Sequence, residues 1–425
     1  MNFSKTPETL AGLYECSKGR EVSTDSIHSL FWECAVNLVQ YRTRKTAALV
    51  FFIALTTRLI GVVLTTVTDL NTYARADVNR FSAAAEFIAD GLRRGAYITS
   101  SDFSNTINTW GSALAPFWLL PGPSRIYARV GVALLGAFAV YNVYIIAHSY
   151  GSGQAALVAV VPLIFYPSFI FIHSTVLREA AVLVGLSAST RFLTVPSPRL
   201  SLSTNYGFAA LFLWFSLVFR PDNLPVIVAV LALAIVVKYR HVIAGSVVRY
   251  FVPPIAIVGT VLAYPQAKEI VRSLAIIRRN RARGRTEYLG HMFPETVMSA
   301  IAFSWIGAMY FLFTPFPWMV EDVTGFIALF EGLGNLVFAV FSVIGARKLG
   351  TRNSTVGVVL TAGVVLGAVL YGLGNANVGT AIRQRQMLLW VIFLLGGLGI
   401  AEKVQFIVGI GSTTDSGITT HSESQ

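Results

Sequence analysis

Charged residues are scarce in this 425-residue chain. Asp, Glu, Lys and Arg make up 13% of it, against about 25% in an average soluble domain, while hydrophobic residues make up 54%. This composition excludes a disordered chain, which needs low hydrophobicity and high charge. It also excludes an ordinary soluble enzyme, because so few charges could not cover its surface. An integral membrane protein remains.

The chain also lacks the short motifs that hold nucleotides and catalytic zinc. It contains neither a Gly-x-x-x-x-Gly-Lys-Ser/Thr loop nor a Gly-x-Gly-x-x-Gly element, and no His-Glu-x-x-His pair. Its two cysteines, Cys16 and Cys34, precede the first long apolar run and fit reduced cytosolic thiols. No internal repeat is visible, which weakens a transporter interpretation. We therefore expect chemistry that needs no nucleotide cofactor.

Long apolar runs recur along the chain, and about 20 apolar residues cross a bilayer as one helix. Two stretches, 104–121 and 298–316, are bounded by Pro and are predicted only to dip into the membrane. Ten others are predicted to span it: 47–67, 126–147, 154–173, 180–194, 206–219, 223–238, 250–265, 325–345, 355–373 and 386–404. The predicted fold is an all-α polytopic bundle of about ten transmembrane helices with two dipping segments.

The basic surplus predicts the topology. Lys and Arg number 33 against 21 Asp and Glu, and three short basic stretches occur at 41–45, 238–249 and 346–352. With ten spans, all three stretches face the cytoplasm, as the positive-inside rule requires. Twelve spans would place 238–241 outside, against this rule. The preferred ten-span topology predicts that both chain ends are cytoplasmic.

Three regions follow from this topology. Residues 1–46 form a predicted cytoplasmic segment, with an amphipathic helix from Ile27 to Val39 on the inner leaflet. Residues 47–404 form the membrane domain, and the Gly/Ser/Thr-rich tail 405–425 is predicted to be cytoplasmic and flexible. Loop 266–297 is rich in Arg, but it lies between membrane segments without interleaved aromatics, so nucleic acid is not an expected partner.

The same topology gathers a small set of polar residues on the outer face. Asp77 opens a helical pattern in the first outer loop, where it is either a helix cap or a carboxylate that acts as base or metal ligand. Arg178 and Glu179 stand between two apolar spans, where they either neutralise each other or face the cavity of Asp77. Weaker acidic candidates share the first outer loop: Asp69, Glu86, Asp90 and Asp102.

Basic residues near the outer face are candidates for holding a phosphate. Arg220 lies in a tight turn beside Asp222, where a local ion pair is the simpler interpretation. Arg383 and Arg385 precede the last predicted span, and their planar guanidiniums suit a phosphate, a pyrophosphate or lipid headgroups. Arg58 falls near the middle of the first span, where a buried Arg needs a partner, and Glu331 is the candidate.

The order of these features resembles the GT-C superfamily of membrane glycosyltransferases that use polyprenyl-phosphate-linked sugars. It is most similar to the bacterial and archaeal relatives of the protein mannosyltransferases, over roughly residues 47–404. The features are Asp77-x-x-x-Phe81-x-x-Ala84, Pro121-Gly122-Pro123-Ser124, Pro167-Ser168, Ser174-x-x-Leu177-Arg178-Glu179, Thr314-Pro315-Phe316-Pro317-Trp318 and Asn377-Val378-Gly379-Thr380-x-x-Arg383-x-Arg385.

The resemblance implies a hexosyltransferase in the cell membrane with an outward-facing active site. Asp77 would be the catalytic base or a ligand of a divalent metal, and Glu179 the second acid. The later basic residues would bind the donor phosphate: Arg383, Arg385, Arg178 and Arg220. The partners would be a polyprenyl-phosphate sugar, membrane lipids, and a glycan, lipid or protein acceptor.

The chain departs from the family pattern at three points. Arg178-Glu179 stands where many relatives have Lys-Asp, and neither the doubled acidic motif nor the large soluble C-terminal domain of some members is present. Three other functions stay open: a polymerase or ligase of surface polysaccharide, a lipid or glycan transporter without catalysis, and a structural assembly subunit.

Overall fold

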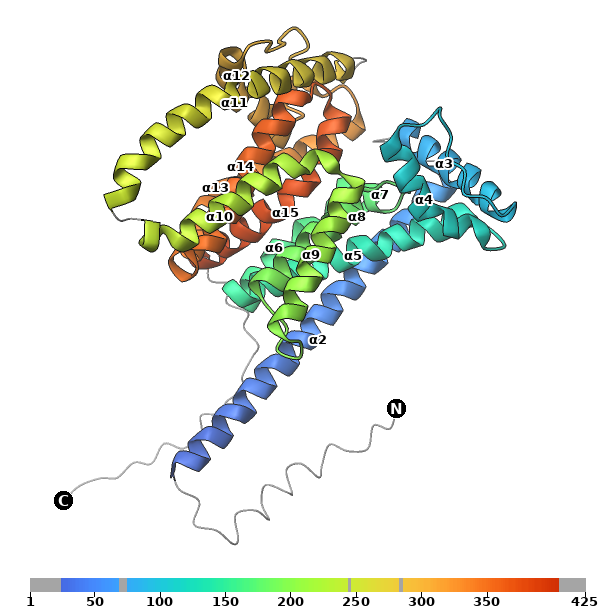
Figure 1. Cartoon of the computed structure of the whole chain (residues 1–425). Helices are drawn as coiled ribbons and strands as arrows, with labels where there is room; N and C mark the ends of the chain where they lie inside the picture. The colour runs from blue at the N-terminus through green and yellow to red at the C-terminus, as the bar shows by residue number, and fades with distance from the viewer. Residues whose placement is uncertain (1–23, 69–74, 244–245, 283–285, 405–425) are drawn as a thin grey trace, which may run out of the picture.

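The computed structural model describes residues 24–68, 75–243, 246–282 and 286–404, and these residues form a helical bundle without a β-strand (Figure 1). The helices are α2 (Thr24–Val67), α3 (Arg75–Arg93), α4 (Asn105–Leu119), α5 (Ser124–Tyr150), α6 (Gly153–Phe165), α7 (Pro167–His173), α8 (Glu179–Thr194), α9 (Leu202–Phe219), η2 (Pro221–Asn223), α10 (Leu224–Ile243), α11 (Ser246–Arg281), α12 (Val297–Phe313), η3 (Pro317–Met319), α13 (Val323–Arg352), α14 (Ser354–Gly374) and α15 (Val378–Lys403).

Within the described residues, seven helices are long and apolar enough to cross a membrane. An eighth passage is formed if α6 and α7, which meet at an angle of 62°, count as one span broken before Pro167. The chain is therefore an all-α multi-pass membrane protein, as its apolar runs predicted. The two remaining predicted spans correspond to α8, whose 16 residues reach about 24 Å, and to the first part of α11.

Paired contacts at both ends show that α2 and α5 run in opposite directions. Arg129 at the start of α5 donates to Thr66 Oγ1 at 2.7 Å, and Thr43 Oγ1 lies 3.2 Å from His148 Nε2 near the end of α5. The bundle thus has two ends. We call the end near Thr66 the site end and the end near Thr43 the basic end.

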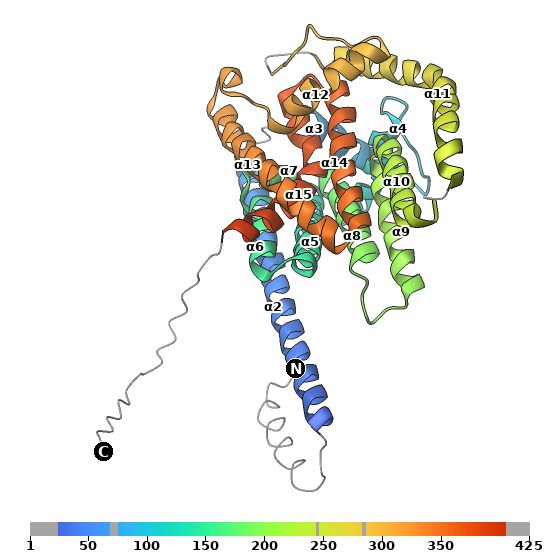
Figure 2. The same cartoon turned by 90° about the vertical axis from the view of Figure 1, so that its left-hand side faces the viewer.

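The basic end collects the predicted basic stretches. Arg352 at the end of α13 donates to Tyr150 O at 2.6 Å, and Lys348 lies 3.4 Å from Glu402 near the end of α15. The stretch 41–45 contains Thr43, and α10 runs from the site end towards the basic end (Figures 1 and 2). Within the described residues, the stretches 41–45 and 346–352 and the end of α10 therefore lie at one end of the bundle, as the ten-span topology predicts.

The two predicted dipping segments are short helices at the site end. α4 has 15 residues and α12 has 17. The last residue of α12, Phe313, packs its backbone against Gly332 in the interior of α13, and the chain then returns to Val323, where α13 begins. α12 thus enters the bundle and the chain comes back to the same end, which is the geometry expected of a dip.

Other predictions meet the structure less closely. The stretch Ile27–Val39 is not a separate helix, because α2 runs without a break from Thr24 to Val67. The last span was predicted to begin at 386, but α15 begins at Val378, where Asn377 accepts a hydrogen bond from the Thr380 amide at 3.2 Å as its N-cap. Residues 1–23, the tail 405–425 and Asp69 lie outside the described residues.

Glycines bring α13 and α15 into close backbone contact. A Cβ on Gly345 would collide with Leu395 O, and a Cβ on Gly399 would collide with Phe341 O. The hydrophobic effect does not drive helices together inside lipid. Small residues let the two backbones approach closely, so that van der Waals packing holds the helices together. This packing fixes α15, the most deeply buried of the long apolar helices among the described residues.

Gly345→Ala is therefore expected to destabilise the fold by about 1–3 kcal/mol, because the added methyl forces the two helices apart. Gly350→Ala on the same helix is the control, since a Cβ there has no neighbour within 4 Å. Thermal unfolding in detergent followed by intrinsic fluorescence measures both. Equal melting temperatures for the two variants would contradict the close contact of α13 and α15.

Candidate functional site

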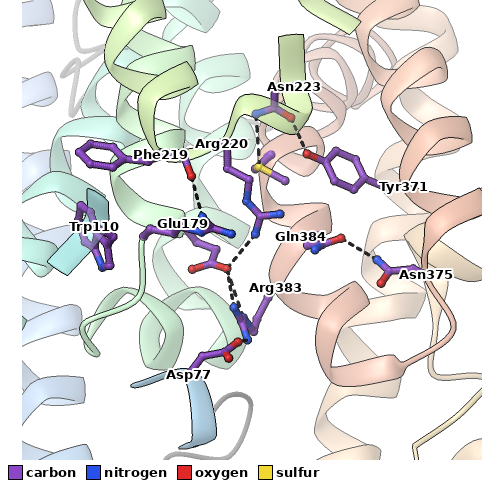
Figure 3. A network of polar contacts seen from close by, with 12 residues as sticks. Asp77, Trp110, Glu179, Phe219, Arg220, Asn223, Tyr371, Asn375, Arg383 and Gln384 are labelled. Atoms are coloured by element: carbon purple, nitrogen blue, oxygen red, sulfur yellow. Dashed lines mark hydrogen bonds and ion pairs between the residues drawn. The ribbon is translucent and has the colours of Figure 1, made fainter. Parts of the chain in front are cut away.

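Five of the six predicted site residues meet at the site end of the bundle (Figure 3). They come from four parts of the chain that are distant in sequence. Asp77 belongs to the first turn of α3, Arg178 and Glu179 to the start of α8, Arg220 to the turn after α9, and Arg383 to the second turn of α15.

Arg383 joins the two acidic residues. Its Nη1 lies 2.5 Å from Asp77 Oδ2, and its Nε and Nη2 lie 3.2 and 3.1 Å from Glu179 Oε1. The Glu179 side chain is fully buried, Arg383 is 11% exposed, and Asp77 is 38% exposed. Glu179 is thus the enclosed anchor of the cluster, while Asp77 stands at its open side.

A second guanidinium reaches the same oxygen of Glu179. Arg220 Nη2 lies 3.2 Å from Glu179 Oε1, so the predicted local pair of Arg220 with Asp222 is replaced by a pair with Glu179. Two guanidiniums favour the ionised form of the carboxyl group and offset its burial. The other oxygen, Glu179 Oε2, is buried without a hydrogen-bond partner among the described residues.

Arg178 contributes a third cation. Its guanidinium contacts Phe219 and does not form the predicted ion pair with the adjacent Glu179. Its Nη1 donates to Phe219 O at 2.8 Å, and its guanidinium carbon lies 6.0 Å from the centre of the Phe81 ring. Burial, together with the neighbouring Arg220 guanidinium, lowers the pKa of Arg178 to about 10, which leaves it charged at neutral pH. Three guanidiniums and two carboxylates therefore carry a net positive charge.

Arg385 is the predicted site residue that the structure places elsewhere. Residues two apart on a helix differ by about 200° in direction, so Arg383 and Arg385 point to opposite sides of α15. Arg385 is 1% exposed and donates to Leu312 O at 3.2 Å and to Thr314 O. It binds the end of α12 and is absent from the cluster around Glu179.

Arg58 also differs from its prediction. It does not pair with Glu331: it donates to Ala54 O and Leu163 O, both at 2.9 Å, and lies 3.4 Å from His173 Nδ1. Glu331 Oε1 instead accepts the Ser168 amide at 2.8 Å. Both residues act inside the bundle.

Four polar residues at the edge of the cluster were not singled out from the sequence. Tyr371 donates to Asn223 Oδ1 at 2.6 Å, and Asn375 Nδ2 donates to Gln384 Oε1 at 2.8 Å. Asn223 follows Arg220 in the turn, and Gln384 adjoins Arg383. The sequence did contain a signal for Asn223 and Gln384. Each is a polar residue next to a predicted site residue and near the end of a predicted span.

The acids of the cluster do not fit a divalent metal. Asp77 and Glu179 share Arg383, and Glu179 also binds Arg220, so an added cation would face guanidiniums at close range. In the part of the chain that the structure describes, no three His, Cys, Asp or Glu side chains gather in a way that could hold a metal. The arrangement fits an anion.

An apolar cavity of about 160 Å³ adjoins the cluster. Its polar end is formed by Asn223 and Tyr371, and the backbone N–H of Asn223 donates to Arg220 O at 3.1 Å. Away from this end the lining is mostly aliphatic, with residues of α8, α10, α14 and α15 such as Leu193, Val230 and Val364. Ser189, Thr190 and Trp390 also line it. Dry apolar cavities of this size admit a ring or a short apolar chain.

No known protein family, no curated protein and no solved structure matches this chain.

Proposed function

We propose that this protein transfers a sugar from a polyprenyl-phosphate-linked donor to an acceptor at the site end of the bundle. The observation that carries the proposal is Arg383, which joins the carboxylates of Asp77 and Glu179 inside a cluster of net positive charge. In such a cluster the Asp77 carboxylate can act as a base, and the guanidiniums next to it can bind an anion.

The guanidiniums supply the anion site. Arg383 and Arg220 present several N–H donors beside Glu179, and Arg178 adds a third charge. Phosphate oxygens pair well with such planar donors, and the pairing strengthens as negative charge develops on a departing phosphate. Glu179 keeps two of the guanidiniums in place before the donor arrives.

The apolar cavity supports a lipid carrier for that phosphate. It begins next to Arg220, at the turn residue Asn223, and continues between α8, α10, α14 and α15. The outer side of α10 is largely exposed, with Val228 and Ile235 more than half accessible. A prenyl chain could therefore enter from the membrane while its phosphate reaches the guanidiniums.

The chemical step follows from these positions. The donor phosphate competes with Asp77 for Arg383, and its binding releases the Asp77 carboxylate. Asp77 then accepts the proton of an acceptor hydroxyl, whose oxygen forms a bond to the anomeric carbon. The bond from that carbon to the phosphate oxygen breaks, and its electron pair leaves with the polyprenyl phosphate. A single displacement inverts the anomeric configuration.

The proposed orientation places the site end outside the cytoplasm and the basic end within it. The stretches 41–45 and 346–352 and the end of α10 lie at the basic end, which favours this orientation by the positive-inside rule. Ten spans, with α4 and α12 as dips, bring both ends of the membrane domain to the cytoplasmic side. The protein would then act on the outer face of the cell membrane.

The experiment is a transfer assay in proteoliposomes that contain the purified protein and a polyprenyl-phosphate sugar. Release of polyprenyl phosphate and labelling of an added acceptor would support the proposal. A polymerase or ligase would lengthen or join glycans, and a transporter would move the lipid-linked sugar across the bilayer without cleaving it. Flux without bond cleavage would overturn the proposal.

The cavity provides a separate prediction. Gly363 lines it on α14, and a Cβ there meets only Val230 at 3.7 Å, so Gly363→Phe should fill the cavity without a backbone clash. The KM for a long-chain donor should rise about tenfold, and the KM for a donor with one or two isoprene units should change less. Gly350→Phe, whose Cβ points into open space, is the control. Equal effects on both donors would argue against a lipid in this cavity.

A further inference from the structure

Four aromatic rings form a continuous row at the site end, which we call the aromatic ladder: Tyr288, Tyr310, Phe316 and Trp318. The Tyr288 and Tyr310 rings stack with centroids 5.6 Å apart, Tyr310 meets Phe316 at 4.8 Å, and Phe316 stacks on Trp318 at 5.0 Å with an angle of 4° between the planes. The ladder crosses from the loop before α12 to the turn after it.

The inner end of the ladder is fixed to the segment just before α15. Tyr288 is 3% exposed, and its amide donates to Ala376 O at 2.9 Å, directly before the helix that carries Arg383. Its ring lies 5.9 Å from the guanidinium carbon of Arg278, a fully buried residue that donates to Met292 O and Leu289 O at 2.9 and 3.0 Å. The buried Tyr288 hydroxyl has no hydrogen-bond partner among the described residues.

The outer end is open, and hydrogen bonds close the turn that carries it. Trp318 is 73% exposed, while Phe316 behind it is half-buried. The turn between them is closed by the Met319 amide, which donates to Phe316 O at 2.9 Å, and by the Phe316 amide, which lies 3.5 Å from Met319 Sδ. A flat aromatic face is thus presented in one orientation at little further cost in entropy.

A membrane anchor is the simplest use of an exposed Trp, because Trp is enriched at lipid interfaces. Trp305 on α12 fits that use: it is 67% exposed and stands outside the ladder. Trp318 differs because it ends a row of rings that leads to the segment before α15, the helix that carries Arg383, and because two exposed acids, Glu321 and Asp322, follow it. These carboxylates repel anionic headgroups and accept hydrogen bonds from hydroxyl groups.

We propose that the aromatic ladder is a saccharide-binding platform, with Trp318 as its outermost contact, that presents a glycan acceptor to the site. A pyranose ring has an apolar C–H face, which packs on an aromatic plane, and a rim of hydroxyls, which suits the acids nearby. The role as acceptor platform rests on the proposed transferase function; binding of saccharide does not. Among the acceptor classes predicted from the sequence, the ladder selects a carbohydrate.

Direct binding tests the ladder without any donor. Protein in lipid nanodiscs is titrated with cellotetraose, mannotetraose and chitotetraose, followed by saturation-transfer NMR. We expect at least one probe to bind, Trp318→Ala to weaken it about tenfold, and Trp318→Phe to retain most of the affinity. Trp305→Ala should match the wild type.

Several outcomes would overturn the inference. No binding of any probe at millimolar concentration would do so, as would equal affinities for Trp318→Ala and Trp305→Ala. Reduced incorporation of Trp318→Ala into nanodiscs, with unchanged saccharide binding, would assign Trp318 to lipid anchoring. If transfer is detected, Trp318→Ala should raise the KM for the acceptor while kcat and the KM for the donor stay unchanged. Saccharide binding without any transfer would remove the proposed function and leave the platform intact.

Discussion

Asp77→Asn is expected to lower kcat for sugar transfer about 10²- to 10⁴-fold, the contribution of a positioned general base. The side chain keeps its size and can still accept a hydrogen bond from Arg383, so the fold should be unchanged. Because the neutral amide competes less strongly for Arg383 than a carboxylate does, the KM for the donor should stay the same or fall. Initial rates of polyprenyl phosphate release, with donor and acceptor varied separately, measure both parameters.

Asp102→Asn is the matched control, since Asp102 is an exposed acid between α3 and α4. Its kinetic constants should equal those of the wild type. A rate for Asp77→Asn within twofold of the wild type would eliminate Asp77 as the base. A large rise in the KM for the donor, with kcat retained, would instead assign Asp77 to donor binding.

Arg383→Gln is expected to have the largest effect on stability as well as on activity. It removes one of the two guanidiniums that bind the fully buried Glu179 carboxylate and leaves Asp77 without its ion pair. Removing one partner of a buried ion pair costs about 3–5 kcal/mol when the remaining charge is left unpaired. The cost here should lie at or below the lower end of that range, because Arg220 still pairs with Glu179. The melting temperature in detergent should fall, and the KM for the donor should rise since the main phosphate ligand is lost.

Two further variants separate charge burial from simple loss of packing. Adding Glu179→Gln to Arg383→Gln leaves the buried Arg220 guanidinium without its carboxylate partner, so the double variant should be less stable than Arg383→Gln alone. Arg279→Gln should shift stability by no more than about 1 kcal/mol, because Arg279 and its partner Glu295 are 64% and 68% exposed. If the double variant is the more stable one, the ion pair between Arg220 and Glu179 does not stabilise the cluster.

Asp77, Glu179, Arg178, Arg220 and Arg383 meet at one end of the bundle. The transferase proposal requires this arrangement, because the base and the phosphate-binding guanidiniums must act on one donor.

The position of Arg385 was not predictable from its neighbours in the sequence. The sequence places two arginines two positions apart before a predicted span, and both looked available to one phosphate. Once Asn377 caps the helix and α15 begins at Val378, the pair falls within the helix and its members diverge by about 200°. A helix start that moves by a few residues thus decides which side chains share a site.

The membrane class, the bundle of apolar helices, the two short helices α4 and α12 and the acid at the start of α3 were determined by the sequence itself. Each follows from composition, hydropathy or helical spacing, which are properties of neighbouring residues. Which charges meet was decided by tertiary structure, because Arg383 contacts Glu179 across 204 positions and Asp77 across 306. The aromatic ladder belongs to the same class, since Tyr288 reaches Tyr310 only when the loop before α12 folds back over it. Apolar helices have similar hydropathy, so hydropathy does not predict which helix faces pack together. Close glycine contacts, such as that of Gly345 with Leu395, determine which faces meet.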